Sequence, residues 1–116
     1  MRPPLIRSLV LTLLLGSIVG ASPAFAESNL GVEVFGRWCA GCHADSPLAP
    51  GTVLLRATRG AEFAVIEQRT DLTPEYVKYL VRKGRAGMPS FRRTEINAEE
   101  LTAVAEYLDG TKEQAR

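Results

Sequence analysis

The sequence predicts a small all-α domain. Three segments place apolar residues at helical spacing, two of them have clear start signals, and no pair of runs alternates apolar and polar residues as paired strands would. A chain of 116 residues is long enough for one domain. A domain this small usually needs a staple or an enclosed cofactor, and its two cysteines are too close together for a strongly stabilising disulfide.

The N-terminal segment has the pattern of a secretory signal peptide. Two arginines precede an apolar run from about Leu9 to Val19, and Ala24-Phe25-Ala26 forms a cleavage pattern. The run is shorter than the roughly 20 residues of a membrane-spanning helix, so a retained anchor is the weaker alternative. We therefore expect residues 1–26 to be removed and residues 27–116 to act in the periplasm, without membrane insertion.

The charge balance excludes some partners. Both arginines before Leu9 leave with the signal peptide, so the 14 basic residues fall to 12, against 13 acidic ones. A nearly neutral chain does not favour binding to nucleic acid or to an anionic membrane, because both select an excess of Lys and Arg.

The first predicted helix covers about Leu30 to Trp38, with Ser28 or Asn29 as its N-cap. After it, residues 44–72 contain several Pro and Gly and are expected to form a loop. At most a short helix is expected there, over residues 60–68.

Two further helices have stronger start signals. Thr73-Pro74-Glu75 combines a capping hydroxyl, a proline at the first helical position and an early acid, and the helix should end at Gly84. The third helix should begin at Asn97, with Glu100 completing a capping box, and stop at Gly110.

The segment RWCAGCH, residues 37–43, holds both cysteines and the only histidine. Structural zinc normally takes four Cys or His ligands, often as two separated pairs, whereas this chain offers three that lie together. A thiol–disulfide couple of the thioredoxin kind begins just after a strand, but a helical pattern precedes Cys39. The oxidoreductase is therefore a distant alternative.

The third interpretation is C-x-x-C-H as a c-type haem attachment motif. Two thiols three residues apart can form thioethers to the two vinyl-derived carbons of one porphyrin, while the next residue reaches the iron. Cys39 and Cys42 are therefore the predicted attachment residues for one haem c, and His43 is the predicted proximal iron ligand.

A haem that carries electrons usually has a second axial ligand, and Met is common because its thioether favours reduced iron. Met88 is the only methionine after the signal peptide, and it lies in a Gly- and Pro-containing loop between two predicted helices. A lone Met more often fills a gap in a core, but this context favours the ligand. With both axial positions filled, the haem would transfer electrons and the chain would have no catalysis of its own.

These residues make the chain resemble class I cytochromes c. The resemblance covers nearly all of residues 27–116 and rests on the following positions: Gly31, Phe35, Cys39, Cys42, His43, Met88, Pro89, Val104, Tyr107 and Leu108. It implies helices packed around one covalently bound haem, with terminal helices that cross closely at Gly31 and pack Phe35 against Tyr107. It also implies that a proline carbonyl, which we assign to Pro50, accepts from the outer nitrogen of His43.

A narrower resemblance comes from residues 67–85 and 88–96. They are similar to the cytochrome subunit of p-cresol methylhydroxylase and related flavocytochromes that oxidise 4-alkylphenols or eugenol-type alcohols. The resemblance implies a flavoprotein dehydrogenase that gives electrons to the haem one at a time, and a downstream acceptor. The main alternative is a free shuttle for another periplasmic dehydrogenase, such as a quinoprotein.

Five cations bracket the predicted ligand Met88 in the sequence: Arg82, Lys83, Arg85, Arg92 and Arg93. An ordinary solvated surface would explain them. We expect instead that they steer an electron-transfer partner, because charges near a docking site accelerate encounter.

Overall fold

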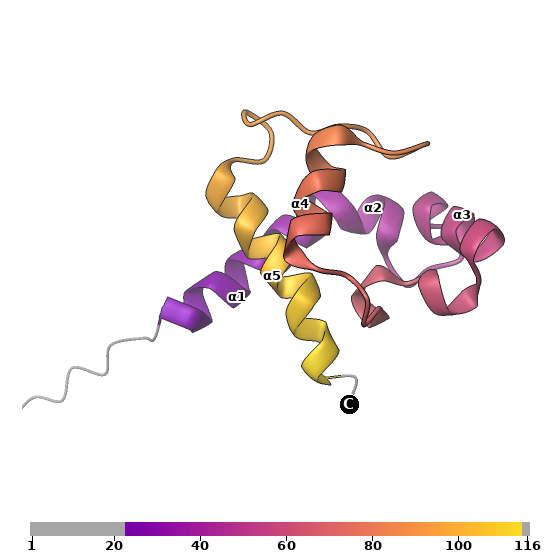
Figure 1. Ribbon diagram of the computed structural model, residues 1–116, viewed down its shortest axis with the longest axis horizontal. Helices are drawn as coiled ribbons and strands as arrows, with labels where there is room; N and C mark the ends of the chain where they lie inside the picture. Colours follow the sequence, from indigo (N-terminus) through magenta and orange to yellow (C-terminus); the bar gives the residue numbers. More distant parts are fainter. Residues whose placement is uncertain (1–22, 115–116) are drawn as a thin grey trace, which may run out of the picture.

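The computed structural model describes residues 23–114, and within them it is all-α with no strand. Its elements are α1 (Pro23–Val34), η1 (Phe35–Cys39), α2 (Ala40–His43), α3 (Pro50–Arg59), η2 (Ala61–Phe63), η3 (Ile66–Gln68), α4 (Pro74–Lys83) and α5 (Ala98–Gln114). Figure 1 shows α1 and α5 crossing, with α4 beside α5 and α3 at the far end beyond α2. The predicted fold class is confirmed.

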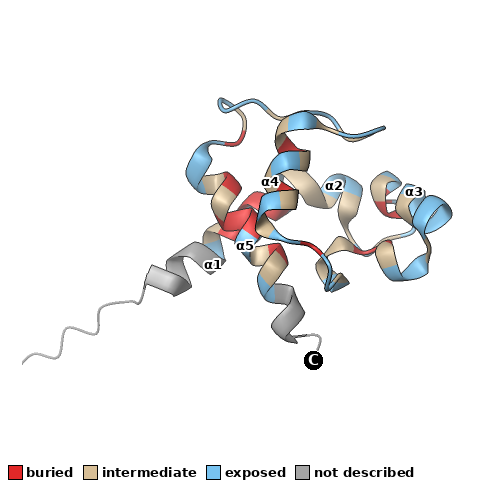
Figure 2. Ribbon diagram, viewed as in Figure 1, coloured by how far each residue is buried: buried red, intermediate tan, exposed pale blue. Residues whose placement is uncertain are grey.

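The core lies where α1, α4 and α5 meet, and Figure 2 shows buried residues gathered at this crossing. A Cβ atom on Gly31 would lie 2.5 Å from the carbonyl oxygen of Ala103 and 2.6 Å from Cβ of Tyr107. Only glycine allows the two helices to approach this closely. The rings of Phe35 and Tyr107 pack at the same crossing, with centroids 5.7 Å apart, as the family resemblance implied.

The predicted starts of α4 and α5 are confirmed by their caps. Oγ1 of Thr73 accepts from the backbone N–H of Tyr76 at 3.3 Å, and Pro74 opens the helix. At α5, the Asn97 N–H donates to Glu100 Oε2 and the Glu100 N–H donates to Asn97 Oδ1, both at 2.9 Å. This reciprocal pair is a complete capping box.

Three predicted helix boundaries are wrong. The first helix begins at Pro23, so neither Ser28 nor Asn29 is its N-cap. Beyond Val34 the chain stays helical through a π turn to His43, past the predicted end at Trp38. The last helix runs through Gly110 to Gln114, because a single glycine costs an α-helix only about 1 kcal/mol.

The segment predicted as loop contains a helix that the sequence reasoning missed. Pro50 opens α3 at its first position, and Gly60 follows its last residue with φ of 117°. These are ordinary start and stop signals. Residues 60–68 contain two short 3₁₀ turns, η2 and η3, in place of the short helix expected there.

The predicted signal peptide lies mostly outside the described residues, so it stays a prediction. Within residues 23–114, no helix combines the length and the apolar character needed to cross a membrane.

Candidate functional site

A π turn positions the first cysteine. The backbone N–H of Ala40 donates to the carbonyl of Phe35, five residues back, and this widened turn ends at Cys39. Such turns are frequent at functional sites, because they shift the phase of the side chains that follow. The next turn, α2, carries Cys42 and His43. Neither cysteine is in a disulfide; Cys39 is part-buried and Cys42 is exposed.

Two atoms of this motif are buried without a hydrogen-bond partner. Within the described residues, Nε1 of Trp38 and Nδ1 of His43 are the buried side-chain polar atoms that no group satisfies. Buried polar atoms are normally bonded, so each such exception calls for an explanation. Burial also lowers the pKa of His43, which favours the neutral imidazole that can ligate a metal.

The segment after the histidine packs back onto it. A Cβ atom on Gly51 would lie 2.7 Å from the carbonyl oxygen of Cys42 and 2.9 Å from Cε1 of His43. Buried Thr52 donates from Oγ1 to the carbonyl of Ala44 at 2.8 Å. Pro50 is exposed, and because Nδ1 of His43 is unbonded, the predicted bond to a proline carbonyl is not made in this structure. The role of Pro50 stays a prediction.

Met88 closes a tight turn directly after α4. Arg85 and Met88 exchange both backbone hydrogen bonds, at 3.0 and 2.9 Å, and Ala86 between them has φ of 51°. Gly84 has φ of 67°, and a Cβ atom there would lie 2.7 Å from the carbonyl oxygen of Met88. Gly84 therefore both ends α4 and lets the turn fold back closely. The Met88 side chain is part-buried against the core.

The rest of this loop is tied to α4 and to the cysteine motif. The N–H of Phe91 donates to the carbonyl of Val81 at 2.8 Å, and Arg82 donates to the carbonyl of Phe91 at 3.1 Å. The ring of Phe91 meets that of Trp38 edge to face, with centroids 5.8 Å apart. The residue before Cys39 and the loop of Met88 are therefore in direct contact.

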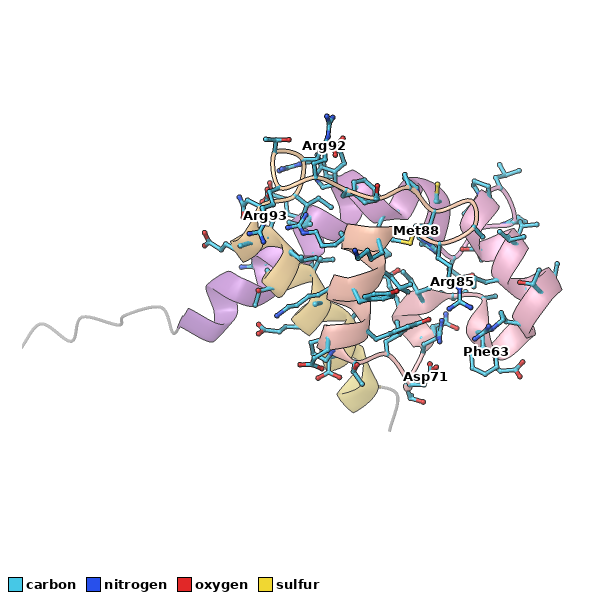
Figure 3. The ribbon with its side chains drawn as sticks, turned by 45° about the horizontal axis from the view of Figure 1, so that its top comes forward. Phe63, Asp71, Arg85, Met88, Arg92 and Arg93 are labelled. Carbon is cyan, nitrogen blue, oxygen red and sulfur yellow. The ribbon has the colours of Figure 1, made fainter. Side chains whose placement is uncertain are left out.

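The five cations near Met88 do not form one free patch. Arg82 bonds inward to the carbonyls of Phe91 and Asn97, and Arg92 pairs with Glu95 at 3.4 Å. Figure 3 shows Arg92 and Arg93 together at one end of the loop, with Met88 toward the other. Arg85 belongs to the turn of Met88, and its guanidinium donates to the hydroxyl of Tyr76 at 3.3 Å.

The electrostatics of Cys39 do not suit a thiol–disulfide couple. Burial raises the pKa of the Cys39 thiol to about 11, with smaller contributions from Cys42 and Glu67. A redox-active cysteine needs a lowered pKa, since the thiolate is the reacting form. Helix also precedes the motif, where a thioredoxin-like fold would have a strand. The described residues contain no cluster of three or more His, Cys, Asp or Glu that could hold a metal ion.

Comparison with known proteins decides the family. The family described as cytochrome c oxidase, cbb3-type, subunit III matches residues 18–108. The chain belongs to this family and is a class I cytochrome c. It carries one covalently attached haem c and is an electron-transfer protein.

Two relatives illustrate the range of similarity to this cytochrome. Cytochrome c6 of Gloeothece citriformis is 29% identical over 105 residues, which cover 90% of each chain. The cytochrome c subunit of 4-cresol dehydrogenase (hydroxylating) of Pseudomonas putida is 32% identical over 95 residues, which cover 80% of this chain and 72% of that one. No solved structure matches this cytochrome significantly.

The residues of the motif fit a covalent haem. Two thiols lie one turn apart, and the adjacent histidine has an unbonded ring nitrogen and a pKa that burial lowers, which favours its neutral form. The sequence reasoning missed the supporting residues Gly51, Thr52 and Glu67. Pro50 next to Gly51 could have indicated the start of a packed helix, but Glu67 has no local signal, since its partner lies 40 residues away.

Proposed function

We propose that this cytochrome is the haem subunit of a flavocytochrome whose flavoprotein subunit oxidises 4-alkylphenols. The observation that carries the proposal is its similarity to the cytochrome c subunit of 4-cresol dehydrogenase. Residues 67–85 and 88–96, which resemble that group in sequence, form most of η3 and α4, the turn of Met88 and the loop beyond it. Because Met88 would bind the haem iron, this loop would lie beside the haem, where an electron donor has to approach.

Cys39 and Cys42 would hold haem c through thioethers, and His43 and Met88 would bind its iron. When bound, the haem supplies a one-electron couple. The chain's contribution is to favour the neutral form of His43 by burial, to pack Gly51 against its ring, and to hold Met88 in a turn backed by Gly84. The soft sulfur of Met88 would favour the reduced state of the haem. With His43 and Met88 both bound to the iron, no position would be left for a substrate, so the subunit would carry electrons and the flavoprotein would oxidise the substrate.

The proposed location is the periplasm. Residues 1–26 would direct export and be removed, which leaves a cytochrome domain of residues 27–116. N-terminal sequencing of the protein purified from its native host should begin at Glu27. A mature protein that begins at Met1 would contradict the proposed export.

Purification from the native host tests whether a flavoprotein subunit binds this cytochrome. The holoprotein, isolated at low salt, should carry a flavoprotein subunit, and a 4-alkylphenol added under anaerobic conditions should reduce the haem. Recovery of the cytochrome alone, with reduction by a quinoprotein or another dehydrogenase fraction and not by a flavoprotein, would favour the free shuttle.

A further inference from the structure

Glu67 is held at the crossing of the terminal helices. It lies in η3, and the hydroxyl of Tyr107 in α5 donates a short, part-buried hydrogen bond to its carboxylate. The Tyr107 ring in turn packs against Phe35, which opens the π turn that ends at Cys39. The carboxylate is thus fixed to the frame that carries the first attachment cysteine.

The same short segment is also tied to the chain after the haem motif. The neighbour of Glu67, Gln68, donates from Nε2 to Asp45 at 3.1 Å, and Asp45 lies two residues after His43. Ile66 packs against the core that Cys39 also contacts. Both flanks of η3 are therefore anchored beside the motif.

The negative charge of Glu67 is felt at two surrounding groups. It contributes to the raised pKa of Cys39, after burial and Cys42. Burial, then the hydrogen bond to Glu67 and its charge, raise the pKa of Tyr107 to about 12. Both effects are those of an anion in a partly desolvated place.

No cation in the described part of the chain pairs with this anion. The next basic residue, Arg69, makes two hydrogen bonds to Asp71, at 2.8 and 2.6 Å, and its guanidinium lies over the ring of Phe63. Among residues 29–110, whose side chains the structure describes, Glu67 is in no salt bridge. None of these side chains therefore cancels its charge.

We propose that Glu67 lowers the reduction potential of the haem, as a fixed negative charge that the Tyr107 hydroxyl holds beside the attachment site. The inference rests on the proposed attachment at Cys39. Reduction adds one electron and forms no bond, so the oxidised site is more positive by one charge and a nearby anion favours it. Tyr107 is the positioning residue, since without its hydrogen bond the carboxylate can turn toward water.

Spectroelectrochemical titration of the purified holoprotein tests this. Glu67→Gln keeps the size of the side chain and an acceptor oxygen but removes the charge. We expect it to shift the reduction equilibrium toward the reduced state about threefold, which is about 30 mV for a one-electron couple. Glu62→Gln is the matched control, because Glu62 is exposed in the neighbouring turn and the net charge changes equally. The Glu67 shift should persist at high salt, since a partly buried charge is screened less.

A second comparison tests Tyr107. In a Tyr107→Phe background, which keeps the ring against Phe35, the change from Glu67 to Gln should shift the potential less than in the wild type. An equal shift in both backgrounds would overturn the role of the hydroxyl, and equal shifts for Glu67→Gln and Glu62→Gln would overturn the role of the charge. Haem stain on a denaturing gel distinguishes these failures from a failure of the proposed attachment, since covalent haem should be present in every variant.

Discussion

The two cysteines differ in burial, and burial makes the Cys39 thiol less reactive. Cys39 is part-buried and its thiol has a pKa raised to about 11, while Cys42 is exposed. The buried thiol would be a poor nucleophile for disulfide exchange at neutral pH, because little thiolate is present. At the scale of single residues, the site is therefore suited to sulfurs that are held in stable bonds.

The predicted role of Met88 as the second iron ligand can be tested by a single substitution. Met88→Ala should lower the reduction potential by at least about 59 mV, a factor of ten for one electron, because the soft sulfur that favours reduced iron is removed. Spectroelectrochemistry measures the shift, and Ser90→Ala in the same loop is the control. A far-red methionine-to-iron charge-transfer absorption that survives in the oxidised Met88→Ala protein would reject Met88 as a ligand.

The terminal helices depend on one close contact. Gly31→Ala would place a Cβ 2.5 Å from the carbonyl oxygen of Ala103 and 2.6 Å from Cβ of Tyr107. Neither atom can rotate away, since one belongs to the backbone and the other is bonded directly to it. We expect it to reduce the free energy of unfolding by about 1–3 kcal/mol, as overpacking does. Denaturant unfolding measures this, with Gly36→Ala as the control, since a Cβ at Gly36 meets nothing within 4 Å. Equal stability of the two variants would mean that the crossing tolerates more separation than its geometry indicates.

Elements were predictable where their signals are local. Thr73 and Pro74 start α4 through contacts within one turn, and the Asn97 capping box does the same for α5. The end of α5 was not predictable from Gly110, because tertiary packing decides whether a helix continues past a tolerated glycine. The π turn at Phe35–Cys39 could not be predicted from the sequence either, since no residue pattern requires a single widened turn.

At the scale of the whole molecule, the cations near Met88 form two separate groups, and comparing them can locate the face on which an electron donor docks. Lys83 and Arg85 flank the start of the Met88 turn, whereas Arg92 and Arg93 lie at the other end of the loop. Tunnelling needs close approach, and charges beside the contact steer the encounter more than they add affinity.

Charge reversal at each pair of cations tests which end of the Met88 loop the electron donor approaches. Lys83→Glu with Arg85→Glu should slow association with the electron donor severalfold in dilute buffer and flatten its salt dependence, with a smaller effect from Arg92→Glu with Arg93→Glu. Screening over about 10 Å at 0.1 M salt should erase most of the difference. Stopped-flow reduction across a salt series measures it. Salt slopes identical to wild type in both double variants would mean that the partner docks elsewhere.

The candidate site was predictable only in part. RWCAGCH, together with the helical pattern before Cys39, predicts haem attachment, and the one methionine after the signal peptide left a single candidate for the second ligand. The contacts that support these residues join distant parts of the chain, such as Trp38 with Phe91 and Tyr107 with Glu67. Such contacts depend on the packed fold, so no local pattern predicts them.

Peptide mass spectrometry tests the central claim most directly. Trypsin cleaves after Arg37 and Arg56, so one peptide of the purified holoprotein, residues 38–56, contains both cysteines and His43. We predict that this peptide carries the mass of one haem and has no thiol available for alkylation after reduction, and that Cys39→Ala with Cys42→Ala yields a haem-free peptide. A wild-type peptide without haem that takes up two alkyl groups would contradict the account.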